Sequence, residues 1–156
     1  MGSLVFLGKA SKTGAYRKVF EWGRQLRSGI DVMVSLSKFL RSAEGGQIAF
    51  WCPGCDGAHA IQIDEGPGPR WGYNGNHEKP TFTPSVLVRG EDFTETGRAD
   101  YQAWYAAGCP PRNSESFESQ PIVCHSFITD GRIQFLGDCT HALAGQTVNI
   151  PDFDEA

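Results

Sequence analysis

The spacing of hydrophobic residues along the chain changes near residue 43, from a helical period to a strand period. Between residues 15 and 40, hydrophobic side chains recur at helical intervals with basic residues between them, at Val19, Trp22, Leu26, Ile30, Val34 and Leu36. This pattern predicts one or two short amphipathic helices, although Gly23 and Gly29 lower the helix propensity. A basic segment of this kind packs on its own domain, contacts a membrane surface or an acidic partner, or stays disordered.

Short strand patterns separated by turn residues follow from residue 47 onwards. The Asp130-Gly131 pair between two apolar runs is a strong hairpin signal, because both residues tolerate the positive φ of a tight turn. A long loop is predicted over 65–84, which holds four prolines and four glycines. The predicted strands are 47–51, 59–63, 85–88, 121–127, 132–136 and 147–150.

Residues 90–120 are polar and interrupt this series of strands. They are predicted to form a surface insertion with one short helix over 100–107, which Gly108 stops. The domain organisation that follows is a basic, partly helical N-terminal extension over 1–42 and a β domain over 43–156. At 156 residues the chain has the length of one ordinary domain, or of a smaller domain with an appendage.

The net charge of −4 conceals an uneven distribution of charge. Residues 1–42 carry eight basic and two acidic residues, whereas 43–156 carry six basic and sixteen acidic residues. The acidic part would repel phosphate, which disfavours nucleic-acid binding except through the basic N-terminus. No apolar run approaches the roughly 20 residues of a membrane-spanning helix, so we expect no membrane span.

The first residues of the chain set an expectation for its location. An apolar patch at 4–7 precedes the first charges, which is the reverse of the order in a secretory signal. We therefore expect a cytoplasmic protein. Met33 offers an alternative start to Met1, and that start would leave most of the basic segment outside the protein.

The Cys52-Pro53-Gly54-Cys55 motif, which lies between two predicted strands, is the most informative tetrapeptide of the sequence. Two thiolates separated by two residues can both bind one tetrahedral zinc ion at about 2.3 Å. A redox-active motif of this type normally opens a helix, whereas Asp56-Gly57 follows here and predicts none. The sequence thus predicts a metal site, with redox-active or incidental thiols as the alternatives.

A tetrahedral zinc site needs two further ligands, and the chain offers more candidates than that. These candidates are His59, Cys124, His125, Cys139 and His141. The first choice is a closed, structural, all-thiolate site of Cys52, Cys55, Cys124 and Cys139, and in the second choice His141 replaces Cys139. Cys109 lies in the polar insertion and is expected to be a free thiol. The predicted fold class is therefore mainly β: a small zinc-stabilised β domain with long loops and an N-terminal basic α-helical extension.

A serine at a loop-to-strand junction is the candidate nucleophile. Ser85 follows Pro84 where the predicted loop enters a strand. A serine attacks an acyl group when an imidazole removes its proton, and a third group usually orients that imidazole. The candidate combinations are Ser85 with His125, and Ser85 with His141 and Asp138. The structural alternative is that Ser85 caps a turn and that the histidines support strands.

These motifs resemble those of a family of small, poorly characterised proteins, through Cys52-Pro53, Trp71, Pro84-Ser85, Cys124-His125 and Gly131-Arg132-Ile133. Some members occur in phage genomes, often under the label ammonia monooxygenase. Others occur in bacterial operons that resemble ubiquitin-conjugation pathways, and a peptidase role has been suggested for them. The resemblance covers residues 47–150 apart from the insertion. We reject the monooxygenase label, because that enzyme is an integral membrane copper protein and no membrane span is predicted here.

The operon-type pattern has a serine in a Pro-Ser-Val context, which Ser85 matches, and a histidine to which His125 corresponds when the Gly-Arg-Ile turns are aligned. The operon-type cysteine precedes its histidine by three residues, whereas Cys124 directly precedes His125. The phage type is closer through its Cys-His-Ser-Phe run and the stretch 140–145. The resemblance implies serine-peptidase chemistry with Ser85 as nucleophile and His125 as base.

Two functions of different classes follow. The first is a serine-type peptidase with structural zinc that acts on a peptide or isopeptide-like bond in a bacterial host cell, with a protein, a peptide or a ubiquitin-like protein as its partner. The second is a non-catalytic zinc-binding interaction module, such as a phage accessory factor, for which the acidic insertion offers a contact surface. The acidic charge of the body disfavours a third function, a nucleic-acid-binding zinc ribbon.

Overall fold

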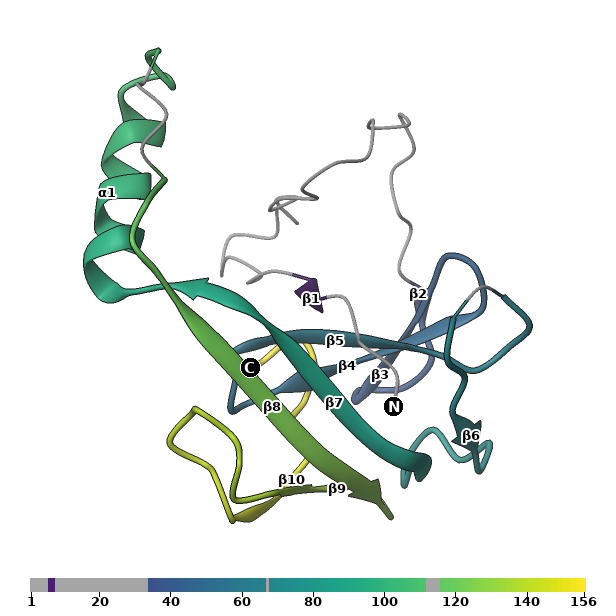
Figure 1. Ribbon diagram of the computed structural model, residues 1–156. Coiled ribbons are helices and arrows are strands. Elements are labelled where there is room, and N and C mark those ends of the chain that lie inside the picture. The colour runs from purple at the N-terminus through teal and green to yellow at the C-terminus, as the bar shows by residue number, and fades with distance from the viewer. Residues whose placement is uncertain (1–5, 8–33, 67, 112–115) are drawn as a thin grey trace.

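The computed structural model describes residues 6–7, 34–66, 68–111 and 116–156 of the chain. In these residues the chain forms two five-stranded antiparallel sheets and one helix (Figure 1). The prediction of a mainly β fold is thus confirmed. Most of the predicted N-terminal helical segment lies outside the described residues.

The first sheet has the strand order β1-β5-β4-β3-β2. Its strands are β1 (Phe6–Leu7), β2 (Val34–Ser35), β3 (Leu40–Ala43), β4 (Gln47–Cys52) and β5 (Gly57–Gln62). The hairpin of β4 and β5 turns at the Cys-Pro-Gly-Cys motif, and Cys52 pairs with Gly57 at its end. The strands predicted at 47–51 and 59–63 therefore exist, and they place the cysteine motif at one end of the sheet.

Residues 34–40 differ from the helix that their hydrophobic spacing predicts, because they form β2 and a tight turn into β3. Within this turn Ser37 Oγ accepts hydrogen bonds from Phe39 N and Leu40 N, at 3.1 and 3.2 Å. Side-chain bonds of this kind compete with the backbone bonds of a helix. The predicted N-terminal extension ends at residue 42, which lies within β3. Strands β2 and β3, within residues 34–43, therefore belong to the same sheet as β4.

The second sheet has the strand order β10-β9-β8-β7-β6. Its strands are β6 (Gly72–Tyr73), β7 (Phe82–Phe93), β8 (Ser119–Thr129), β9 (Arg132–Phe135) and β10 (Thr147–Asn149). The hairpin of β8 and β9 turns at Asp130 and Gly131, whose φ angles of 50° and 76° confirm the turn that the sequence predicts. Strand β7 is longer than the predicted 85–88, because the polar stretch after Val88 continues to pair with β8 through its backbone.

The hydrophobic core lies between the two sheets, which pack face to face (Figure 1). Phe50 on β4 and Phe82 on β7 stack across the interface with 6.3 Å between ring centroids. Both sheets contribute to the same buried cluster, which includes Leu40, Ile48, Ile61, Val86, Val88, Ile128, Ile133 and Phe135. Alternation along β7 and β8 therefore gives each strand one face toward this core and one face away from it.

The polar insertion forms an arm that projects beyond the sheets and contains α1 (Glu95–Ala106) (Figure 1). The helix begins before the predicted residue 100, because Thr94 Oγ1 accepts a hydrogen bond from Gly97 N at 3.1 Å and caps the helix. Tyr101 packs on Phe93 and Phe117, with 5.3 Å between ring centroids in each pair. No helix in the described ranges has the length and apolar character that crossing a membrane requires.

Candidate active site and metal centre

A bulge in β7 sets the position of Ser85. Phe82 pairs with Ile128 and Val86 pairs with Ser126, so three residues of β7 lie opposite the single residue Phe127 of β8. Bulges interrupt the alternation of side chains and re-aim them, and they are common beside active sites. The backbone oxygen of Ser85 also accepts a hydrogen bond from Trp71 Nε1 at 3.2 Å, which ties the bulge to the preceding loop.

His125 lies on the outer face of β8, beside this bulge. Its neighbours Cys124 and Ser126 are both buried at 1% exposure, so alternation directs the His125 side chain away from the core. His125 Nε2 lies 3.1 Å from Ser85 Oγ, within hydrogen-bond reach. The predicted pairing of these two residues is therefore present in the structure.

Asp138 lies in the loop that follows β9, and its Oδ2 is 3.1 Å from His125 Nδ1. Backbone hydrogen bonds hold this loop against β8: Leu136 N donates to His125 O at 2.8 Å, and Thr140 N donates to Val123 O at 2.9 Å. The loop therefore brings Asp138 to the edge of the outer face. The Asp138 side chain is 54% exposed, whereas that of His125 is 20% exposed.

The two contacts of His125 define how its imidazole can act. A carboxylate can only accept hydrogen bonds, so Nδ1 carries the proton that faces Asp138. In the neutral ring Nε2 is then the acceptor, and it can receive the hydroxyl proton of Ser85. This is the arrangement in which an imidazole removes the proton of a serine while a carboxylate keeps the ring in the required tautomer.

The alternative base His141 is placed elsewhere by the structure. Its Nδ1 accepts a hydrogen bond from Leu143 N at 3.3 Å, and its ring packs edge-on against Phe135 at 4.6 Å between centroids. Asp138, which the sequence analysis combined with His141, contacts His125 instead. Sequence spacing misses this pairing because the loop after Phe135 turns Asp138 back toward β8.

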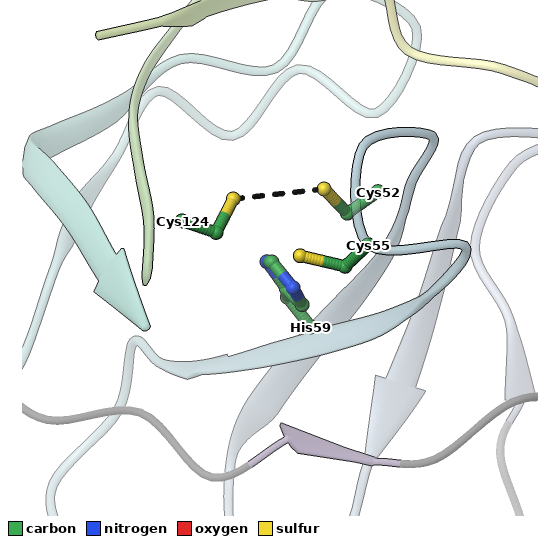
Figure 2. Close-up of side chains that lie close together, drawn as sticks. All are labelled: Cys52, Cys55, His59 and Cys124. Carbon is green, nitrogen blue, oxygen red and sulfur yellow. Dashed lines mark hydrogen bonds between the residues drawn. The ribbon is translucent and has the colours of Figure 1, made fainter. Parts of the chain in front are cut away.

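A group of metal-ligating side chains lies on the inner side of β8, between the two sheets. Cys52, Cys55, His59 and Cys124 offer ligand atoms that all lie within 4.8 Å of one another. Figure 2 shows these four side chains directed toward one another from β4, the following turn, β5 and β8. The sulfur atoms of Cys52 and Cys124 are 3.8 Å apart, which is about the S–S edge of a tetrahedron with Zn–S bonds of about 2.3 Å.

A second group overlaps the first one through Cys124. Cys124, Cys139 and His141 also offer ligand atoms within 4.8 Å of one another. Among the residues that the structure describes, none forms a hydrogen bond with the buried Nε2 of His141. Close packing of His141 also explains the glycine in the motif, because a Cβ on Gly54 would lie only 2.3 Å from Cε1 of His141.

The thiols of the first group have strongly perturbed pKa values. The pKa of Cys52 is lowered to about 2, because the thiols of Cys124 and Cys55 donate hydrogen bonds to its thiolate. The same hydrogen bond to Cys52 raises the pKa of Cys124. The pKa of Cys55 is lowered by its hydrogen bond with Cys124. Its hydrogen bond with Cys52, its burial and the charges of neighbouring thiolates outweigh this effect and raise the pKa. The ionisation of one thiol of the cluster thus opposes the ionisation of the others, and a cation is what would let all three ionise together.

The two histidines beside the thiols are suited to metal binding in their protonation state. Burial lowers the pKa of His59 and of His141, although the charge of Cys52 opposes the shift in both. Both imidazoles are therefore held neutral, which is the form that binds a metal ion. His59 is one of the ligand candidates predicted from the sequence, but neither preferred ligand set includes it. The strand that faces His59 cannot be known from sequence spacing.

The structure brings together all four predicted thiolate ligands and His141, but in two overlapping groups. Cys52, Cys55 and Cys124 lie with His59, whereas Cys139 lies with Cys124 and His141. A coarser prediction, a Cys/His cluster able to hold a metal ion, is confirmed. The exact ligand set stays a prediction. Cys109 lies exposed in the turn after α1 and belongs to neither group.

A serine, an imidazole and a carboxylate joined by hydrogen bonds on a sheet surface form the arrangement that serine hydrolases use on several unrelated folds. The chain belongs to the family described as bacterial ubiquitination-like system serine protease (BubE), whose pattern matches residues 30–136, more than half of the chain. The match includes Ser85 and His125 and ends before Asp138. Comparisons with curated proteins and with solved structures found no match.

This membership confirms the resemblance to the operon-type proteins that the sequence analysis describes. The family description names a ubiquitination-like system, which indicates protein partners for its members. The closer resemblance to phage-type members stays a prediction.

Proposed function

We propose that the protein is a serine-type peptidase, in which Ser85 is the nucleophile, His125 the general base and Asp138 the residue that orients His125. The observation that carries this proposal is the continuous hydrogen-bonded chain from Ser85 Oγ through both ring nitrogens of His125 to Asp138, with 3.1 Å at each contact. The family description supports the reaction type. Because the family match ends at residue 136, the role of Asp138 rests on the geometry alone.

The proposed reaction has two steps. Ser85 Oγ attacks the acyl carbon of the scissile bond while His125 Nε2 takes its proton, and His125 then gives that proton to the departing amine, which leaves an ester on Ser85. In the second step a water molecule gives a proton to His125 and its oxygen attacks the ester. The acid product then leaves, and the proton returns to Ser85 Oγ. Asp138 stabilises the imidazolium that forms in both steps.

The proposed substrate is a peptide or isopeptide-like bond at the end of a ubiquitin-like protein. This substrate class comes from the family description and not from a pocket in the structure. The open positions of Asp138, which is 54% exposed, and of Phe127, which is 44% exposed, support an outer face of β8 that a large molecule can reach. A protein substrate needs such an open approach, because its scissile bond is part of a large molecule.

The test of this proposal is covalent labelling of the full chain with a fluorophosphonate, followed by mass spectrometry of the labelled peptide. We expect the label on Ser85, and we expect the variant Ser85→Ala to lose it. The matched control is Ser119→Ala, an exposed serine at the distant end of β8, which should label like the parent. Labelling that survives in Ser85→Ala would refute the proposal and favour the non-catalytic zinc-binding module.

We further propose that Cys52, Cys55, His59 and Cys124 hold one structural zinc ion. These residues supply three sulfur donors and one nitrogen donor, the soft and borderline ligands that tetrahedral zinc sites use. Four protein ligands leave no open position, so the ion would join the two sheets and take no part in the reaction. The alternative fourth ligands are Cys139, preferred from the sequence, and His141.

The contacts of Cys139 favour His59 over Cys139 as the fourth ligand. Cys139 Sγ lies 3.2 Å from His125 O, to which it donates, and it also accepts a hydrogen bond from His125 N at 3.2 Å. A zinc-bound thiolate could keep the hydrogen bond from His125 N but could not donate to His125 O, so metal binding at Cys139 would cost one of these two contacts. Cobalt substitution can test this choice, because the intensity of the sulfur-to-cobalt absorption counts thiolates. Three thiolates, unchanged in Cys139→Ser, are expected, and four would assign Cys139 to the metal.

A further inference from the structure

The strand pairing that carries the candidate active site becomes irregular beside His125. In a regular antiparallel pair, two residues that exchange hydrogen bonds each donate and accept one. Leu136 N donates to His125 O at 2.8 Å, but His125 N does not return the bond to Leu136 O. It donates to Cys139 Sγ instead, and Leu136 O accepts from Cys139 N and Gly145 N, each at 3.3 Å.

The sulfur of Cys139 therefore takes the place of a backbone acceptor on β8. It contacts both polar backbone atoms of His125, N and O, each at 3.2 Å. The ladder resumes at Thr140, whose N donates to Val123 O at 2.9 Å. Between the two regular contacts the chain forms a small loop, and Asp138 lies in this loop directly before Cys139. One side chain thus fixes the backbone of the candidate base and the loop that carries its carboxylate partner.

Cys139 lies beside the group of four metal-ligating side chains and is not a member of it. Cys139 is half-buried at the rim of the thiol cluster, near Cys124 and His141. The group of four ligand atoms that all lie within 4.8 Å of one another includes His59 and not Cys139. The family match ends at residue 136, so no part of it describes this loop.

We propose that Cys139 is a positioning residue of this peptidase, whose thiol clips the His125 backbone to the 136–140 loop and so holds Asp138 against the imidazole. The proposal rests on the proposed function in that it assigns the His125–Asp138 contact to catalysis. It deepens that function, because it makes the side chain of a cysteine beside the Cys/His cluster the support of the acid–base pair. Alkylation or oxidation of this thiol would remove the clip and lower turnover.

The experiment compares three variants of the zinc-loaded full chain. Cys139→Ala removes the clip, and we expect kcat to fall about 10- to 100-fold with KM changed less than about twofold, because a displaced base slows the chemical step. Cys139→Ser keeps a hydroxyl that can both donate and accept, so it should recover most of the rate. The control Cys109→Ala removes an exposed thiol from the distant turn after α1 and should leave kcat and KM unchanged.

A double variant shows whether Cys139 acts through Asp138. If it does, Cys139→Ala combined with Asp138→Ala should be no slower than Asp138→Ala alone, because both changes remove the same contact. Zinc content and Tm are measured for every variant. Losses that multiply in the double variant, or zinc that is lost from both Cys139→Ser and Cys139→Ala, would overturn the proposal, and the second result would identify Cys139 as a ligand.

A spectroscopic measurement separates the failure of this inference from the failure of the proposed function. In protein with ¹⁵N-labelled histidine, the Nδ1–H signal of His125 reports its hydrogen bond to Asp138 without any substrate. We expect this signal in the parent and in Cys139→Ser, and we expect it to broaden through exchange with water in Cys139→Ala. If Cys139→Ala keeps a sharp signal, Cys139 is not a positioning residue, whatever Ser85 does. If the signal behaves as expected but no labelling occurs at Ser85, only the proposed function fails.

Discussion

Replacement of Asp138 by asparagine tests how much the carboxylate contributes to the proposed reaction. The asparagine side chain would have nearly the same shape as that of Asp138, and its amide oxygen could still accept a hydrogen bond from His125 Nδ1. What the change removes is the negative charge that stabilises the imidazolium formed when His125 takes the Ser85 proton. The variant therefore isolates the electrostatic part of the contact, which is 3.1 Å long in the structure.

The exposure of Asp138 sets the expected magnitude. Two unit charges about 4 Å apart attract each other by about 1 kcal/mol in water and by about 4 kcal/mol at the effective dielectric constant of a protein surface. The Asp138 side chain is 54% exposed, so the lower half of this range applies. The lower half is about 1 to 2.5 kcal/mol, and about 1.4 kcal/mol corresponds to a factor of ten in rate, so we expect kcat to fall about 5- to 60-fold. Replacing a fully buried triad aspartate costs about 10⁴-fold, which is more than this solvated carboxylate can supply.

The assay is the rate of fluorophosphonate labelling of Ser85, measured together with hydrolysis of an activated ester. The matched control is Asp130→Asn, which removes one negative charge from the β8–β9 turn and keeps a residue that this turn accepts. It should react like the parent. If Asp138→Asn also reacts like the parent, while Ser85→Ala is inert, the carboxylate plays no part in the reaction. A loss near 10⁴-fold would refute this estimate and would mean that the asparagine amide donates to Nδ1 and selects the wrong tautomer.

Three further predictions concern stability. Phe50→Ala should lower the free energy of unfolding by about 3–5 kcal/mol in a urea titration, because Phe50 is fully buried between the sheets, and a loss below about 1 kcal/mol would contradict that packing. In metal-free protein, burial lowers the pKa of His59 in the folded state. Its contribution to stability is therefore present above its ordinary pKa of 6.5 and is lost as the pH falls below that value. Urea titrations between pH 5 and 8 should show this decline in the free energy of unfolding, and His59→Leu should flatten it. Gly54→Ala should cost about 1–3 kcal/mol, since its Cβ would lie 2.3 Å from His141 Cε1, whereas Gly90→Ala, with no atom within 4 Å of its Cβ, should cost much less.

Local sequence signals predicted the elements that carry the two candidate sites. Alternation predicted β4 and β5 around the cysteine motif, and the Asp130-Gly131 pair predicted the hairpin of β8 and β9. These predictions hold because strand alternation and turn residues depend on near neighbours in the chain. The pairing of Ser85 with His125 was also predicted, but only with the help of the family resemblance. Spacing alone did not decide between His125 and His141.

Features that depend on the path of a loop or on the partner of a strand were missed. The polar residues after Val88 show no hydrophobic alternation, yet they extend β7 because β8 supplies their backbone hydrogen bonds. The helix predicted up to residue 40 gives way to β2 and β3, because a serine-capped turn and the pairing with β4 outweigh helical spacing. His59 was not preferred as a ligand, since its place opposite Cys124 follows from the packing of two sheets.

The sequence by itself determined which chemical groups this protein possesses and the local frames that hold them. It determined a thiol pair in a tight turn, a serine at the entry to a strand, and a histidine that directly follows a cysteine on another strand. The tertiary structure alone decided on which side of the second sheet each of these groups lies. Because successive residues of a strand face opposite sides, Cys124 points into the core toward the other metal-ligating side chains and His125 points outward toward Ser85. Only the loop after β9 decided that Asp138 belongs to His125, because the hydrogen bonds that position this loop join it to β8, which is distant in the sequence.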